Sequence, residues 1–182
     1  MSFHLWSFGQ HAASSSDVML WRLMAFGDMR VAELYEVLRL RTEVFVLEQN
    51  CLYQDMDGAD PQAMHVLGVR QGELLAYARC FGPGVKFAEA TIGRVITRAS
   101  ARGHGLGHEL MEQAIRAVSQ VWGPQSIRIG AQSRLISYYA QHGFKVASGP
   151  YDEDGIEHVE MLLPSSHEWH ARMSPASSWA KA

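Results

Sequence analysis

The chain has 182 residues, 47% hydrophobic and 19% charged, which is typical of one folded domain and excludes a disordered or fibrous chain. Its 16 lysines and arginines against 19 aspartates and glutamates give a net charge of -3, which excludes a broad basic surface for nucleic acid. Two cysteines exclude a disulfide framework, and the absence of an export signal and of an apolar run of about 20 residues predicts a cytoplasmic protein.

Residues 18–163 are expected to form one domain between two extensions. Residues 1–17 mix aromatic side chains with Gly, His and Ser and follow neither the helical nor the strand period, so we expect a mobile segment. Residues 164–182 begin at a proline and are rich in Ser and Ala, which predicts a second extension. Trp169 and Trp179 could dock this tail on the domain or on a partner.

The first half of the domain predicts several strands and one helix. Apolar residues at helical spacing from Val31 to Phe45 indicate an amphipathic helix, and the segment 50–62, rich in Asp, indicates a loop. Gln71-Gly72 separates two strand-like runs and predicts a hairpin turn. The expected strands are Met19–Phe26, Met64–Arg70, Glu73–Phe81 and Ala88–Ile96.

The second half predicts helices that alternate with strands. The helical period runs from Leu106 to Val118, and a short helix is expected over Leu135–His142. Because strands flank the helices in β-α-β order, we expect an α/β fold of the mixed α+β kind, with a mixed sheet covered by helices. The expected strands are Ile127–Ala131, Phe144–Ala147 and His158–Leu163.

A glycine-rich turn joins the strand that ends at Ile96 to the helix that begins at Leu106. Gly103, Gly105 and Gly107 let the backbone curl into a nest of N–H groups, and the helix dipole adds about half a positive charge there. These features predict an anion site for a phosphate or pyrophosphate. The turn lacks the Gly-Lys-Ser/Thr of a Walker A loop and the spacing of a dinucleotide fingerprint. On spacing alone, a tight turn without a ligand remains an alternative.

Three segments resemble the GNAT superfamily of acyl-CoA-dependent N-acetyltransferases. Residues 102–107, Arg-Gly-His-Gly-Leu-Gly, resemble its R-x-x-G-x-G signature, and residues 138–144 resemble its later Y-x-x-x-G-F element. Residues 41–49 followed by residues 53–60 resemble one branch, the ElaA-like proteins. The resemblance covers most of residues 19–163. It implies a central mixed sheet that is splayed near its middle, with acetyl-CoA in the gap.

The resemblance also implies which residues bind acetyl-CoA, the expected co-substrate. A splayed strand leaves backbone N–H and C=O groups that the amide-bearing pantetheine arm can pair with as an added strand. The pantetheine arm is expected on Arg94, Val95 and Ile96, and the pyrophosphate on Arg102, Gly103, His104, Gly105, Leu106 and Gly107. No metal is expected, because the nine histidines are scattered and form no H-E-x-x-H motif.

Acetyl transfer from a thioester to an amine needs a proton acceptor, a donor to the oxyanion and an acid for the departing thiolate. Tyr139 matches the tyrosine of the family element and is the expected acid, with simple packing as the alternative. Glu48 and His65 are the candidate bases. The alternatives are an ion pair for Glu48, a structural hydrogen bond for His65, and a water chain to either. A main-chain N–H of Val95 or Ile96 is the expected oxyanion donor.

The acceptor is expected to be a small-molecule amine or an exposed amine of a protein. Asp55 and Asp57, on the acidic loop, could attract and contact it, although aspartates of such loops commonly stabilise their own turns. Gln132 stands where many members of the superfamily carry Asn, and it receives no catalytic role. We expect no nucleic-acid or membrane partner, and a homodimer is compatible with the sequence.

Two further hypotheses compete with an acetyltransferase. The first is a non-catalytic module that binds or senses acyl-CoA. The second is an acyltransferase with longer acyl donors, because residues 44–49 also resemble acyl-homoserine lactone synthases.

Overall fold

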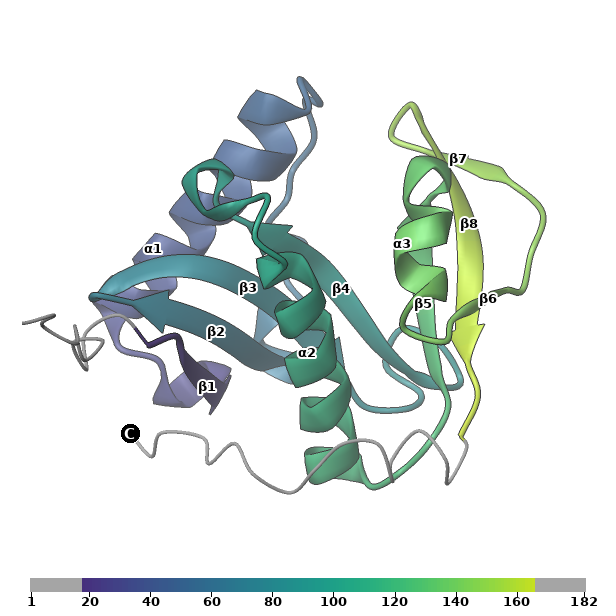
Figure 1. Ribbon diagram of the computed structural model, residues 1–182, viewed down its shortest axis with the longest axis horizontal. Helices are drawn as coiled ribbons and strands as arrows, with labels where there is room; N and C mark the ends of the chain where they lie inside the picture. The colour runs from purple at the N-terminus through teal and green to yellow at the C-terminus, as the bar shows by residue number, and fades with distance from the viewer. Residues whose placement is uncertain (1–17, 166–182) are drawn as a thin grey trace, which may run out of the picture.

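Residues 18–165, which the computed structural model describes, form a mixed sheet with helices on both faces (Figure 1). The strands are β1 (Leu20–Ala25), β2 (Met64–Arg70), β3 (Glu73–Phe81), β4 (Ala90–Thr97), β5 (Ile127–Gln132), β6 (Lys145–Val146), β7 (Tyr151–Glu153) and β8 (Ile156–Leu163). The helices are α1 (Val31–Arg41), α2 (Leu106–Trp122) and α3 (Ile136–Ala140). Most of the predicted extensions, with Trp169 and Trp179, lie outside the described residues.

The sheet divides between β4 and β5. The strand order is β1-β2-β3-β4-β5-β8-β6, with β7 beside β8. β4 and β5 run parallel and pair only through Ala90 with Ile127 and Thr91 with Arg128. Beyond these pairs the two strands diverge (Figure 1), so the rest of β4 has no strand on that side. The predicted fold, a mixed sheet splayed near its middle, is confirmed.

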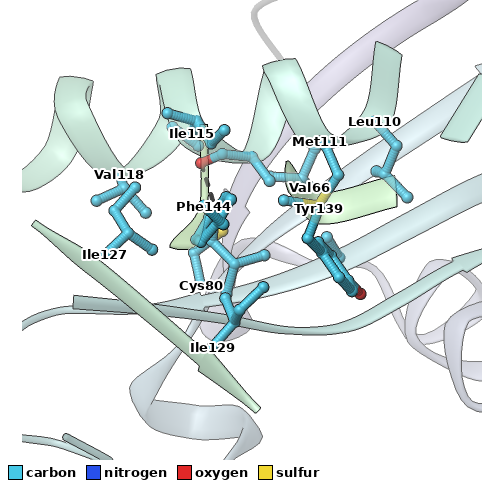
Figure 2. Packing of buried hydrophobic residues seen from close by; sticks show 14 of the residues in the cluster. Val66, Cys80, Leu110, Met111, Ile115, Val118, Ile127, Ile129, Tyr139 and Phe144 are labelled. Carbon is cyan, nitrogen blue, oxygen red and sulfur yellow. Dashed lines mark hydrogen bonds between the residues drawn. The ribbon is translucent and has the colours of Figure 1, made fainter. Parts of the chain in front are cut away.

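The two faces of the sheet carry different helices. Successive residues of a strand point to opposite faces, so Ala78 of β3 packs under α2, whereas Tyr77 packs under α1. α2 buries an apolar stripe that recurs every three or four residues, as in the core cluster of Figure 2. Each large apolar side chain buried in this way stabilises the fold by roughly 1.5–3 kcal/mol. The residues of α2 in this cluster include Leu110, Met111, Ala114, Ile115 and Val118.

Two elements differ from the sequence prediction. The helix predicted to reach Phe45 is α-helical only to Arg41 and continues as the π-helical segment η2 (Thr42–Glu48). Strand β7 was not predicted, although Asp154-Gly155, both with positive φ, is a strong hairpin signal between β7 and β8. Both differences shape the walls of the gap between β4 and β5.

Candidate active site

A cleft of about 980 Å³ runs through the sheet where β4 and β5 diverge. It is lined on the α2 side by Gly107, Tyr138 and Tyr139, and on the α1 side by Phe45 and Gln49, among others. Because the cleft reaches both faces, one reactant can enter from each.

The turn before α2 leaves a set of backbone donors free at the edge of this cleft. Gly103 and Gly105 have φ of +87° and +81°, which a side chain would strain. The N–H groups of His108 and Glu109 donate to the carbonyl of Gly105. Within residues 18–165, the N–H groups of residues 103–107 have no backbone acceptor. This arrangement can bind an anion, as the sequence predicts.

Side chains around the turn fix its position. The hydroxyl of Tyr138 donates to the carbonyl of Gly107 at 2.6 Å. The guanidinium of Arg102 donates to the carbonyl of Thr97 and lies 2.8 Å from the carboxylate of Glu48. Leu106 is buried and anchors the first turn of α2 in the core, and His104 is exposed.

Strand β4 is distorted where it borders the cleft. Arg94 has a φ of 51°, which is rare for a residue with a side chain, and the register with β3 shifts opposite it. Its guanidinium stacks against Phe45 and Tyr53, with its central carbon 5.6 and 5.8 Å from the ring centroids, and its Nε lies 2.7 Å from Asp55. Arg94, Val95 and Ile96, at and next to this distortion, line the cleft in the part of β4 that has no pairing with β5.

Tyr139 lies on α3 at the junction of the core and the cleft. Its ring is edge-on to Phe144 and Tyr138, and in Figure 2 its hydroxyl points away from the other labelled side chains. Burial raises the pKa of Tyr139 to about 12, because the phenolate would lose its hydration. The phenol is therefore protonated throughout the neutral range.

The two candidate bases lie in different surroundings. Glu48 lines the cleft, but its carboxylate pairs with Arg102. His65 is fully buried in β2: its Nε2 donates to the carbonyl of Asp60 at 3.0 Å, and its Nδ1 therefore accepts from the hydroxyl of Tyr77 at 2.7 Å. Burial lowers the pKa of His65. His65 is not among the residues that line the cleft, and its contacts match the structural alternative.

The acidic loop is held by arginines. Asp55, 2% exposed, pairs with Arg41 and Arg94. Asp57 lines the cleft and accepts two hydrogen bonds from Arg79, which hold the pKa of Asp57 well below its usual range. Asp60 bridges Arg41 and Arg79.

This network was not predicted, although it left a signal in the sequence. Arg79 interrupts the buried apolar run of β3, and Arg41 ends the buried face of α1. Charged residues at such positions are almost never fully buried unless they are paired.

The chain matches the family model "Acetyltransferase (GNAT) domain" over residues 29–164. It belongs to the GNAT acetyltransferase family. GNAT proteins use acyl-CoA donors, so the chain is an acyl-CoA-dependent transferase by family. Escherichia coli ElaA is 38% identical over 143 residues, which cover 78% of this chain and 94% of ElaA. A UPF0039 protein of Synechocystis is also 38% identical, over 79% of this chain and 94% of that protein.

Solved structures place the chain in the same GNAT branch. An acyl-CoA N-acyltransferase from Pseudomonas aeruginosa has a TM-score of 0.76 and 41% identity, covering 80% of this chain and 99% of that protein. Escherichia coli ElaA has a TM-score of 0.74 and 36% identity over the same shares. The predicted resemblance to the ElaA-like branch is confirmed.

Two cleft residues of this GNAT domain were missed or left without a role by the sequence analysis. The amide of Gln132, at the end of β5, donates to Gln49 at 3.1 Å and accepts from Arg134 at 2.9 Å, so it links β5 to the segment that follows η2. His158 of β8 also lines the cleft. The β5–β8 register places His158 opposite Gln132, a neighbourhood that no local pattern reveals.

Neither a metal site nor a membrane helix is found in residues 18–165. No group of three or more His, Cys, Asp or Glu side chains there is arranged to hold a metal ion. None of the helices in this range has the length and apolarity that crossing a membrane requires.

Proposed function

We propose that the chain is an N-acetyltransferase that moves the acetyl group of acetyl-CoA to a primary amine by direct attack. The observation that carries this proposal is the row of N–H groups over residues 103–107, which have no backbone acceptor within residues 18–165, next to a cleft whose β4 side is open. A pyrophosphate suits the first feature, and an extended arm that bears amides suits the second.

The residues present fit the acyl donor. Gly103, Gly105 and their neighbours would bind the pyrophosphate through backbone N–H groups, and Arg94, Val95 and Ile96 would pair with the pantetheine arm. Gly107 has little space for a larger residue, since a Cβ there would lie 3.3 Å from the hydroxyl of Tyr138. Bound in this way, acetyl-CoA supplies an activated carbonyl at the junction of the two faces.

Different residues of the cleft would then take part in the successive steps of acetyl transfer. The amine nitrogen forms a bond to the carbonyl carbon, and the electron pair of the C=O bond moves to oxygen. The N–H of Val95 or Ile96 would donate to this oxyanion of the tetrahedral intermediate. When the C–S bond breaks, Tyr139 would give its proton to sulfur as the general acid.

Two carboxylates of β7 and its turn support a cationic acceptor. Glu153 and Asp154 line the cleft and form no ion pair within residues 18–165, whereas Glu48 and Asp57 are paired with Arg102 and Arg79. Carboxylates around a cleft raise the local concentration of cations such as protonated amines. We therefore propose a small-molecule amine or an exposed protein amine as the acceptor. Cys51 and Cys80 are both free, which suits the reducing cytoplasm that we propose as the location.

An assay of coenzyme A release against a panel of amines tests the proposal. With acetyl-CoA as donor, we expect at least one polyamine, amino acid, aminoglycoside or lysine peptide to stimulate release. Tight binding of coenzyme A by calorimetry with a silent panel would instead indicate the non-catalytic binding module. Faster turnover with longer acyl-CoA donors would instead indicate an acyltransferase that uses longer acyl groups.

Replacing Tyr139 tests its role as the acid. Tyr139→Phe should lower kcat by at least about a hundredfold, because the thiolate loses its proton donor. The dissociation constant for coenzyme A should stay within about twofold, since the hydroxyl takes no part in the phosphate turn. An unchanged kcat would remove the assigned role.

A further inference from the structure

We propose that His158 is the general base of the acceptor site, and that its Nε2 accepts the proton that the attacking amine must lose. This inference rests on the proposed acetyltransferase function. It concerns a residue on β8, which the donor site does not involve.

The strand pattern of β8 places His158 on the cleft side of the sheet. Val159 and Met161 belong to the core under α2. Because side chains alternate along a strand, His158 points to the opposite face, where it lines the cleft together with Ile156. This is the face that carries the proposed amine site.

Contacts on both sides of the ring orient its second nitrogen. Nδ1 lies 2.8 Å from the carbonyl oxygen of Ile156. A carbonyl can only accept, so Nδ1 carries the hydrogen, and Nε2 of the neutral ring has a free lone pair. No hydrogen-bond partner of Nε2 is found within residues 18–165.

The ring of Tyr151, on β7, fixes the plane of the imidazole. It stacks on His158 at a centroid distance of 5.9 Å and an interplanar angle of 29°. The hydroxyl of Tyr151 reaches over Gly130, where a Cβ would lie only 3.0 Å away. Because Gly130 has no side chain, it leaves room for the hydroxyl of Tyr151, whose ring packs on the imidazole of His158.

The other titratable groups of the cleft near His158 are less suited to accept a proton. The carboxylate of Glu48 pairs with Arg102, and that of Asp57 with Arg79. The thiol of Cys51 donates to the carbonyl of Asp154 at 3.5 Å. Histidine is also the side chain whose ordinary pKa, about 6.5, lies nearest neutrality.

Further titratable and charged groups around the imidazole come from the loop after η2, from β7 and its turn, and from the segment after β5. Glu160, two residues along β8 on the same face, pairs with Arg128 of β5. Burial raises the pKa of Tyr53 to about 12, so its phenol cannot act as a base near pH 7. The carboxylate of Glu153 lies beside the hydroxyl of Tyr151, and Asp154 is exposed in the turn. Arg134 donates to Gln132. These side chains contribute to the charge around the imidazole, but the proton of the attacking amine goes to His158.

The proton balance closes with His158 and Tyr139 as partners. The ammonium form of the acceptor first gives one proton to solvent. The amine then attacks as its free base, and the new C–N bond leaves a positive charge on nitrogen. Nε2 of His158 accepts one proton from that nitrogen, while the C–S bond breaks and Tyr139 protonates the sulfur. The imidazolium then loses its proton to solvent and the tyrosinate regains one, so the products are the N-acetylated amine and the thiol of coenzyme A.

His158→Asn is the sharpest test, because an asparagine amide can still donate to the carbonyl of Ile156 but has no basic nitrogen. We expect kcat with the amine to fall by about 10²–10⁴-fold. The acidic limb of the kcat/KM profile, which reports the base of the free enzyme, should disappear. The dissociation constant for coenzyme A and the urea midpoint should stay unchanged. Glu157→Gln, at the neighbouring exposed position, is the control and should behave like the wild type.

Each other result separates the inference from the function on which it rests. If His158→Asn keeps the wild-type kcat, His158 is not the base, and the acetyltransferase proposal stands. If kcat falls equally at every pH and the acidic limb persists, His158 only positions the site, and the inference is wrong. If the wild type binds coenzyme A but acetylates no amine, both proposals fail.

Discussion

The glycine-rich turn (residues 103–107) and the acidic loop (residues 50–62) are both polar segments beside the same cleft, but their polar groups differ in how they are paired. In the turn, the N–H groups of residues 103–107 have no backbone acceptor in the described part of the chain. In the loop, the carboxylates of Asp55, Asp57 and Asp60 are paired with buried arginines. Ligand binding requires groups with bonding capacity left, so the turn is suited to a ligand and the loop to holding the wall of the cleft.

The largest expected effect comes from breaking the loop network. Arg41→Leu would remove one of the two arginine partners of each of the buried Asp55 and Asp60, and we expect it to lower the free energy of unfolding by about 3–5 kcal/mol. Urea denaturation measures the change. Arg39→Leu on the same helix is the control, because its pair with Glu36 is exposed to solvent and contributes little to stability. Equal losses in both variants would contradict the structural role of the network.

The pH dependence of stability sharpens the same point. The pKa of Asp57 is lower in the fold than in the unfolded chain, where it is about 3.9. The charged carboxylate therefore stabilises the fold above that value, and the contribution is lost as pH falls through the folded pKa. Asp57→Asn should lower the free energy of unfolding by about 2 kcal/mol at pH 7 and by progressively less toward pH 2. A gap between wild type and variant that is constant with pH would show that Asp57 acts without its charge.

A pair of glycine variants separates backbone strain from ligand binding. Gly105 and Gly72 have φ of +81° and +80°, and a Cβ at either meets no atom within 4 Å. Both Gly105→Ala and Gly72→Ala should therefore lower the free energy of unfolding by about 1–2 kcal/mol. Only Gly105→Ala should also weaken coenzyme A binding, by about tenfold, because the N–H groups of the turn shift. Calorimetry measures the affinity for coenzyme A, and equal affinities in the two variants would contradict a role of the turn in binding.

The smallest effect is expected from Tyr138→Phe. This change removes the hydrogen bond to the carbonyl of Gly107, worth about 1 kcal/mol, and should weaken coenzyme A binding by about fivefold. Its kcat at saturating acetyl-CoA should stay near that of the wild type, the reverse of the pattern expected for Tyr139→Phe. A large fall in kcat with unchanged binding would exchange the roles of the two tyrosines.

Local patterns explain why the structure around the glycine-rich turn could be predicted. The glycine turn, the period of α2 and the Y-x-x-x-G-F element each lie within a short stretch of chain, and backbone geometry turns such spacing into structure directly. The surroundings of the histidines depend on strand register instead. His65 and His158 both lie near the start of a predicted strand. In the structure, His65 on β2 is fully buried, whereas His158 on β8 lines the cleft.

The amino-acid sequence by itself determined the order of most helices and strands, the glycine-rich turn before α2 and the GNAT family of this protein. Only the tertiary structure decided which charged side chains form ion pairs and which side chains face the cleft. The physical reason is distance along the chain: Arg41 meets Asp60 19 residues away, and Gln132 meets Gln49 83 residues away. Such contacts follow from how the strands align, and no local spacing encodes that alignment.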